Sequence, residues 1–114
     1  MTAFEPGSIV LVHFPFTDLS ATKKRPALVV SPTAFSRPHG DIVVLALTSR
    51  PQADTTLELE NWKAAGLPKA TWFKPVIGTL SKQVVVRYLG RLASQDQFRA
   101  ARLVQTMIAG VYLH

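Results

Sequence analysis

The chain has 114 residues, 47% of them apolar, which suits one domain over residues 1–114 that buries its own core. It contains no cysteine, which excludes disulfides, thiolate-bound metals and a cysteine nucleophile. Thirteen lysines and arginines against seven aspartates and glutamates give a net charge of +6. A polyanion is therefore the first partner to consider, although a small basic domain need not bind one.

The sequence predicts neither a membrane anchor nor a secretion signal. The first residues lack a basic region followed by an apolar one. The longest apolar run, Ile42 to Leu47, is far shorter than the ~20 residues that a spanning helix needs. We expect a soluble, cytoplasmic protein.

The first half of the chain alternates apolar runs with polar segments. Strands are predicted at Ser8 to Phe14, Pro26 to Ser31 and Asp41 to Thr48. The last of these is almost continuously apolar, which predicts burial on both of its faces. The intervening segments, Pro15 to Lys24 and Pro32 to Gly40, are predicted as loops.

The second half contains shorter and weaker signals. One helical turn is expected at Asn61 to Ala65, ended by Gly66, and a turn or short helix at Thr79 to Lys82. Short strands are predicted at Thr55 to Leu59, Thr71 to Lys74 and Val84 to Tyr88.

The pattern changes to a helical period near the C-terminus. Ser94 is a candidate N-cap, Gln97 completes a capping box, and Gly110 is a natural stop. Phe98, Ala101, Gln105 and Ile108 recur at helical spacing, with Val104 and Met107 beside them. Many short strands and one terminal helix indicate an α+β, mainly β domain, most simply a small barrel.

Most catalytic signatures are missing. There is no phosphate-binding glycine loop and no histidine or carboxylate cluster that would hold a metal, so neither a metal nor a cofactor is predicted. The histidines His13, His39 and His114 are scattered. They are better explained as ordinary surface residues than as a two-histidine ribonuclease site.

Two polar groups stand at strand ends, where loops carry function on a rigid scaffold. Lys23, Lys24 and Arg25 precede the second strand, and Thr48, Ser49 and Arg50 follow the third. If these strands are antiparallel neighbours, Arg25 and Thr48 meet at one end of the sheet. A guanidinium beside a hydroxyl can cradle a phosphate. The alternative is a solvated charge next to a residue that merely ends a strand.

Several segments resemble the MazF/PemK toxin family, over about residues 6–110. The Arg-Pro-Ala-Leu-Val-Val-Ser stretch at residues 25–31 is the most recognisable of them. The others are Pro6 to Val12, Phe14 to Asp18, Val43 to Ser49, and Leu89 to Leu92.

The resemblance implies an SH3-like barrel, shared with the CcdB gyrase poisons, that works as a homodimer. It implies sequence-selective, metal-independent cleavage of single-stranded RNA, in which the 2′-OH attacks and a cyclic phosphate and a 5′-OH form. The family's catalytic arginine and threonine match Arg25 and Thr48. The resemblance also implies a cognate antitoxin, expected to be an acidic, partly disordered segment joined to a DNA-binding domain.

The same likeness suggests that the segment Phe16 to Lys24 covers the substrate. Phe16 would stack on a base, or it would be a core residue under the loop, and both readings stay open. The lysines and Arg50 would contact phosphates, although each alone could be merely solvated. The predicted RNA-binding residues are Phe16, Thr17, Lys23, Lys24, Ser49, Arg50 and Lys74.

One departure concerns the strand after the helical turn, where several relatives carry an Asp-Gln pair. This chain has Phe73-Lys74 there, followed by Pro75. Lys74 suits a phosphate or a base acceptor rather than reading both edges of a base, so the RNA recognition sequence stays open. The rival hypotheses are a non-cleaving barrel that binds a protein target, as the gyrase poisons do, and a barrel that binds only RNA or the antitoxin.

Overall fold

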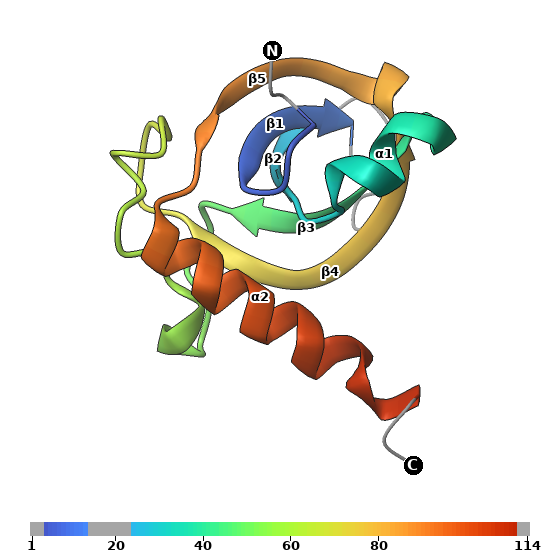
Figure 1. Ribbon diagram of the computed structural model, residues 1–114. Helices are drawn as coiled ribbons and strands as arrows, with labels where there is room; N and C mark the ends of the chain where they lie inside the picture. The colour runs from blue at the N-terminus through green and yellow to red at the C-terminus, as the bar shows by residue number, and fades with distance from the viewer. Residues whose placement is uncertain (1–3, 14–23, 112–114) are drawn as a thin grey trace.

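The computed structural model describes residues 4–13 and 24–111, apart from the side chains of residues 37–39. Within these residues, five antiparallel strands form one sheet in the order β4-β3-β2-β1-β5. They are β1 (Ser8–His13), β2 (Lys24–Val29), β3 (Asp41–Thr48), β4 (Trp72–Ser81) and β5 (Val85–Arg91). The sheet curls without closing, and β4 and β5 wrap around the inner strands (Figure 1). With the C-terminal helix α2 (Ser94–Ile108), this confirms the predicted mainly β, barrel-like α+β fold.

Both faces of β3 are buried, as its apolar run predicted. Leu45 and Leu47 belong to a core shared with α2 and with residues 57–67. Val44 and Ala46 belong to a second core on the opposite face, inside the curl of the sheet. Because successive strand residues point to opposite faces, one continuous apolar run fills both cores.

A helix replaces the loop that was predicted between β2 and β3. α1 (Thr33–His39) begins after Pro32, whose carbonyl oxygen accepts two backbone N–H bonds from the first turn. It ends at Gly40, which has a left-handed φ of 69°. Proline at position 38 argues against a helix interior, which is why the sequence pattern favoured a loop.

The strand predicted at Thr55 to Leu59 is wrong. This segment forms a 3-10 turn, η1 (Thr55–Leu57), followed by a single bridge to β4. The Asp54 carboxylate accepts hydrogen bonds from the hydroxyl and the backbone N–H of Thr56, at 2.6 and 2.9 Å. These bonds bend the chain before a ladder can form, and they hold the pKa of Asp54 below its usual value of 3.8.

β4 continues through Pro75, where the sequence predicted that the strand would end. Its pairing with β3 shifts between Leu45 and Leu47, so that residues 74–76 lie opposite one residue of β3. This bulge accommodates Pro75, which has no N–H to give to the ladder. The turn expected at Thr79 to Lys82 comes later, as η2 (Lys82–Val84).

α2 begins one residue earlier than its predicted cap implied. Ala93 is the N-cap residue, and no side chain caps the helix. Gln97 does not complete a capping box but donates from Nε2 to the Leu92 carbonyl at 2.6 Å. α2 ends at Ile108, and a 3-10 turn, η3 (Ala109–Val111), continues through Gly110. Among the described residues, no helix has the length and the apolar character needed to cross a bilayer.

The packed face of α2 also differs from the predicted stripe. Phe98 is 66% exposed and Ile108 is 59% exposed, and Ala101 and Gln105 between them are exposed as well. A different row faces the sheet: Asp96, Ala100, Leu103, Val104 and Met107. A fully buried carboxylate, Asp96, stands in this row, which is why apolar periodicity pointed to the wrong face.

Candidate functional site

The start of β2 and the end of β3 lie side by side. The two strands pair antiparallel, with Ala27 opposite Ala46. Continuing this register by two residues sets Arg25 opposite Thr48, on the same face of the sheet. Opposite residues in such a ladder have Cα atoms about 4.5–5.5 Å apart. The two strand-end residues singled out from the sequence are therefore neighbours in the fold, and both are half-buried.

The Thr48 hydroxyl is held in place by the turn that follows it. Its Oγ1 accepts a hydrogen bond from the Arg50 backbone N–H at 3.1 Å. The Arg50 carbonyl in turn accepts from Gln52 Nε2 at 2.9 Å. Since the oxygen already accepts, its own proton is the part of the hydroxyl that can be donated to an incoming acceptor.

Arg25 and Thr48 line one cavity of about 400 Å³ at this end of the sheet. Its apolar side chains come from Leu11, Pro26, Leu47, Leu67, Pro68 and Leu89. Its cations are Lys24, Arg25, Lys69 and Arg87, and no carboxylate lies among its described lining residues. Hydroxyls come from Thr48, Ser49 and Thr71. Four cations beside an apolar surface suit an anion that also carries an apolar group.

The outer wall of the cavity, residues 66–71, is fixed to β5 by close glycine contacts. The predicted helical turn is confirmed, because the Ala65 N–H donates to the Asn61 carbonyl at 3.2 Å and Gly66 follows with a φ of 87°. A Cβ atom at Gly66 would lie 2.6 Å from the Leu89 carbonyl oxygen, and one at Gly90 would lie 2.0 Å from the Ala65 carbonyl oxygen. Only glycine allows the backbones to approach so closely.

Asp96 fixes the start of the same segment to α2. Its buried carboxylate accepts from the backbone N–H groups of Glu60 and Asn61, at 3.2 and 2.9 Å. It also pairs with Arg99 at 2.8 Å, and Arg99 reaches on to the Thr56 carbonyl. The side chain that broke the apolar pattern of α2 thus anchors the chain leading into the cavity wall.

Almost the whole chain matches one family of known proteins. Residues 5–108 match the PemK-like, MazF-like toxins of type II toxin–antitoxin systems. The chain belongs to this toxin family. Curated protein sequences give no significant match.

Solved structures of the family have the same fold as this toxin. A mycobacterial endoribonuclease in complex with its cognate antitoxin is 22% identical, with a TM-score of 0.74 over 92% of this chain and 94% of that one. MazF from Deinococcus radiodurans is 19% identical, with a TM-score of 0.73 over 92% and 96%. A second mycobacterial endoribonuclease structure is 23% identical, with a TM-score of 0.72 over 96% and 94%. The resemblance read from the sequence is confirmed.

The other predicted site residues of the toxin fall into three groups. Lys24 and Ser49 line the cavity with Arg25 and Thr48. Arg50 is exposed in the turn after Thr48, and Lys74 is half-buried in the bulge of β4; neither belongs to the cavity lining. Phe16, Thr17 and Lys23 lie outside the described residues.

Sequence reasoning missed Lys69 and Arg87 as lining residues. Each is a lone cation in a segment without a motif, and only the net charge of +6 hinted at more basic groups near the site. Among the described residues, no group of three or more histidines and carboxylates could hold a metal ion. His13 ends β1 opposite Lys24, and its buried Nδ1 has no hydrogen-bond partner within the described part of the chain.

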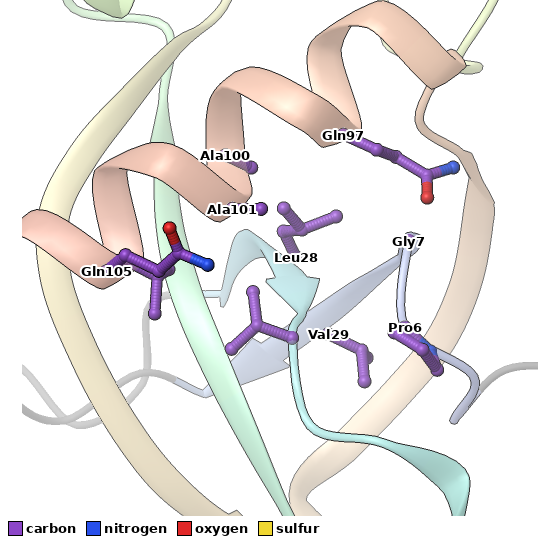
Figure 2. Close-up of a pocket in the computed structure, with 10 residues that line it drawn as sticks. Pro6, Gly7, Leu28, Val29, Gln97, Ala100, Ala101 and Gln105 are labelled. Atoms are coloured by element: carbon purple, nitrogen blue, oxygen red, sulfur yellow. The ribbon is translucent and has the colours of Figure 1, made fainter.

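The toxin has a second hollow, of about 290 Å³, between α2 and the end of β2. Figure 2 shows Ala100, Ala101 and Gln105 of α2 across from Leu28 and Val29, with Gln97 extending towards Gly7 at one end. Its described lining contains no charged side chain. The exposed residues Phe98 and Ile108 lie on the same side of α2 as Ala101 and Gln105, and the exposed Arg102 borders this side.

Proposed function

We propose that this toxin is a metal-independent endoribonuclease that cuts single-stranded RNA sequence-selectively. The observation that carries the proposal is the meeting of Arg25 and Thr48 at one cationic cavity. A phosphodiester offers the negative charge and the acceptor oxygens that these side chains require. The structural relatives described as endoribonucleases support the reaction class.

The proposed chemistry uses a nucleophile from the substrate itself. The ribose 2′-OH gives its proton to solvent and attacks the adjacent phosphorus, the bond to the 5′ oxygen breaks, and that oxygen takes up a proton from solvent. The products are a 2′,3′-cyclic phosphate and a 5′-OH. The protein then has to orient the phosphate and stabilise its growing charge, which fixed donors do effectively.

Arg25 and Thr48 have distinct roles in this proposal. An arginine guanidinium stays charged in proteins, so Arg25 is better suited to an electrostatic clamp on the phosphorane oxygens than to a general base. The Thr48 hydroxyl donates a hydrogen bond to the scissile phosphate, since its oxygen already accepts one from the Arg50 N–H. Further contacts to the RNA strand are proposed for the other predicted RNA-binding residues: Phe16, Thr17, Lys23, Lys24, Ser49, Arg50 and Lys74.

The proposed protein partner is an antitoxin with an acidic segment. A structural relative was solved in complex with its cognate antitoxin. Acidic side chains would find four cations and no carboxylate in the described cavity lining. Such a segment would compete with RNA for the same surface, which accounts for neutralisation without a second site.

The proposed assembly is a homodimer. Its two copies meet at the hollow between α2 and the end of β2, whose described lining is uncharged. Two copies of a chain with a net charge of +6 repel each other, and least where neither presents a charge. Phe98 is 66% exposed and stands about one helical turn from Ala101, which lines the hollow. In the proposed dimer, a two-fold axis places Phe98 of each copy against the hollow of the other, which is the self-complementary arrangement that a symmetric dimer needs.

The test is cleavage of a mixed single-stranded RNA in EDTA. The wild-type chain should produce fragments ending in a cyclic phosphate, and Arg25→Ala should lose at least ~10² in rate, while Arg102→Ala on α2 should cut normally. No cleavage by the wild type, or equal cleavage by Arg25→Ala, would defeat the proposal. In that case a barrel that only binds RNA, antitoxin or another protein becomes the better reading.

A further inference from the structure

The cavity holds a second pair of cations that the proposed cleavage step does not use. Arg87 comes from β5 and Lys69 from the wall segment, and both side chains are exposed. Among the described residues, neither has an ion-pair partner. Two positive groups that line one cavity repel each other, and that repulsion is relieved when an anion lies between them.

The sheet sets the distance between the two cationic sides. Arg87 lies opposite Leu11 across the β1–β5 pairing, and Leu11 lies opposite Pro26 across the β1–β2 pairing. Arg25 is the next residue of β2. Neighbouring strands are about 4.8 Å apart, so roughly 10 Å separates the backbones that carry Arg87 and Arg25. Arg87 shares the face of Leu11 and Pro26, whereas Arg25 starts from the other face, and both line the cavity at this end of the sheet. Two long side chains that reach one cavity from different faces can hold two different phosphates.

The surface between the two sides is apolar and built from several elements. Leu11, Leu47 and Leu89 line it from three strands, and Leu67 adds a contact from the wall. The apolar faces of an unstacked base are removed from water on such a surface. The wall cannot swing away from β5 without losing the glycine contacts at residues 66 and 90, so Lys69 and Arg87 stay on the same cavity.

We propose that this cavity is a one-nucleotide subsite. Its apolar surface takes the base, Arg25 and Thr48 take the scissile phosphate, and Lys69 and Arg87 bind the neighbouring phosphate. This inference rests on the proposed function. It adds Lys69 and Arg87 as positioning residues that set where the strand lies and touch no reacting atom.

The first test measures binding apart from cleavage. The probe is a short random-sequence RNA strand with 2′-O-methyl sugars, which lacks the attacking hydroxyl. Arg87→Gln and Lys69→Gln should each weaken binding several-fold at low salt and reduce the slope of log K against log salt by about 0.7, as expected for one lost contact to a single strand. Lys63→Gln, an exposed lysine outside the cavity lining, should leave both quantities unchanged. Equal binding by all variants would overturn the inference.

The second test asks which phosphate is bound. Dinucleotides with and without a terminal phosphate at either end are compared as substrates. One terminal phosphate should lower KM for the wild-type chain, and this advantage should vanish in Arg87→Gln while kcat stays near its normal value. The inference fails if the variant keeps the full advantage or if it loses kcat instead. Absence of any wild-type cleavage, by contrast, would overturn the proposed function and leave the binding result to stand by itself.

Discussion

Two hollows flank strand β2, and they differ mainly in charge. The start of the strand contributes Lys24, Arg25 and Pro26 to a cavity lined by four cations. Its end contributes Leu28 and Val29 to a hollow without a charged residue in its described lining. The two ends of one six-residue strand therefore line a cationic surface and an uncharged surface.

The difference indicates what each surface can bind. A polyanion gains Coulomb energy at the cavity and nothing comparable at the hollow. A second copy of this basic chain is repelled at the cavity and can approach at the hollow. In the proposed arrangement the RNA and the second copy bind at different surfaces, so both can bind at once. The comparison can be tested at either surface.

The largest effect is expected at the cavity. Thr48→Val keeps the shape of the side chain but removes the hydroxyl, so cleavage should fall by about 10²–10³ while the dimer stays intact. Single-turnover cleavage rates check this. Thr79→Val, on the exposed side of β4, is the matched control and should cut at the normal rate. Normal cleavage by Thr48→Val would remove the hydroxyl from the proposed site.

Stability should depend on the carboxylate that ties α2 to the cavity wall. Asp96→Ala leaves Arg99 and two backbone N–H groups without their partner, so the free energy of unfolding should fall by about 3 kcal/mol. Urea unfolding measures the change. Gln95→Ala, one exposed position away on the helix, should change stability by less than about 0.5 kcal/mol. Equal stability of both variants would mean that the Asp96 network contributes little.

A charge introduced next to the hollow should weaken the proposed dimer. Phe98→Glu introduces a charge into the proposed dimer surface, and the dimer dissociation constant should rise at least about tenfold, equivalent to about 1.4 kcal/mol. Sedimentation equilibrium gives the constant, and Gln83→Glu is the control, because it adds the same charge at an exposed position of η2 outside the described lining of the hollow. A dimer that tolerates Phe98→Glu must be built elsewhere.

The smallest effect is expected at Asp54, which lies in neither hollow. Its pKa is lowered by the Thr56 hydrogen bonds, so the ionised form stabilises the folded state. That contribution is present above the ordinary value of 3.8 and is lost as the pH falls through the lowered pKa. An NMR titration should find a value below 3.8, and Thr56→Val should move it upward. An unshifted titration would show that the turn does not hold the carboxylate.

The sequence predicted what depends on local pattern. The bounds of β3, the helical turn ended by Gly66 and the neighbouring ends of β2 and β3 all follow from short stretches of apolar or polar residues. The strand predicted at Thr55 to Leu59 failed because a side-chain bond from Asp54 competes with the ladder. The end predicted for β4 failed because a bulge absorbs Pro75.

Non-local contacts explain what the sequence could not predict. The packed face of α2 is set by Asp96, whose backbone partners, Glu60 and Asn61, lie more than 30 residues away in the chain. Lys69 and Arg87 join the cavity only because residues 65 and 66 press against β5. Neither the Asp96 hydrogen bonds nor the packing of residues 65 and 66 on β5 produces a periodic pattern in the sequence. The sequence therefore does not identify Lys69 and Arg87 as lining residues.

The pairing of β1 with β5 has a consequence for how the protein is made. Ser8 lies opposite Arg91, so the sheet joins residues from near both ends of the chain. During translation, β1 waits with one edge unpaired until β5 has emerged from the ribosome. Arg87 arrives with that same strand. The cavity that we propose for RNA can therefore be completed only after β5 has been made and has paired with β1.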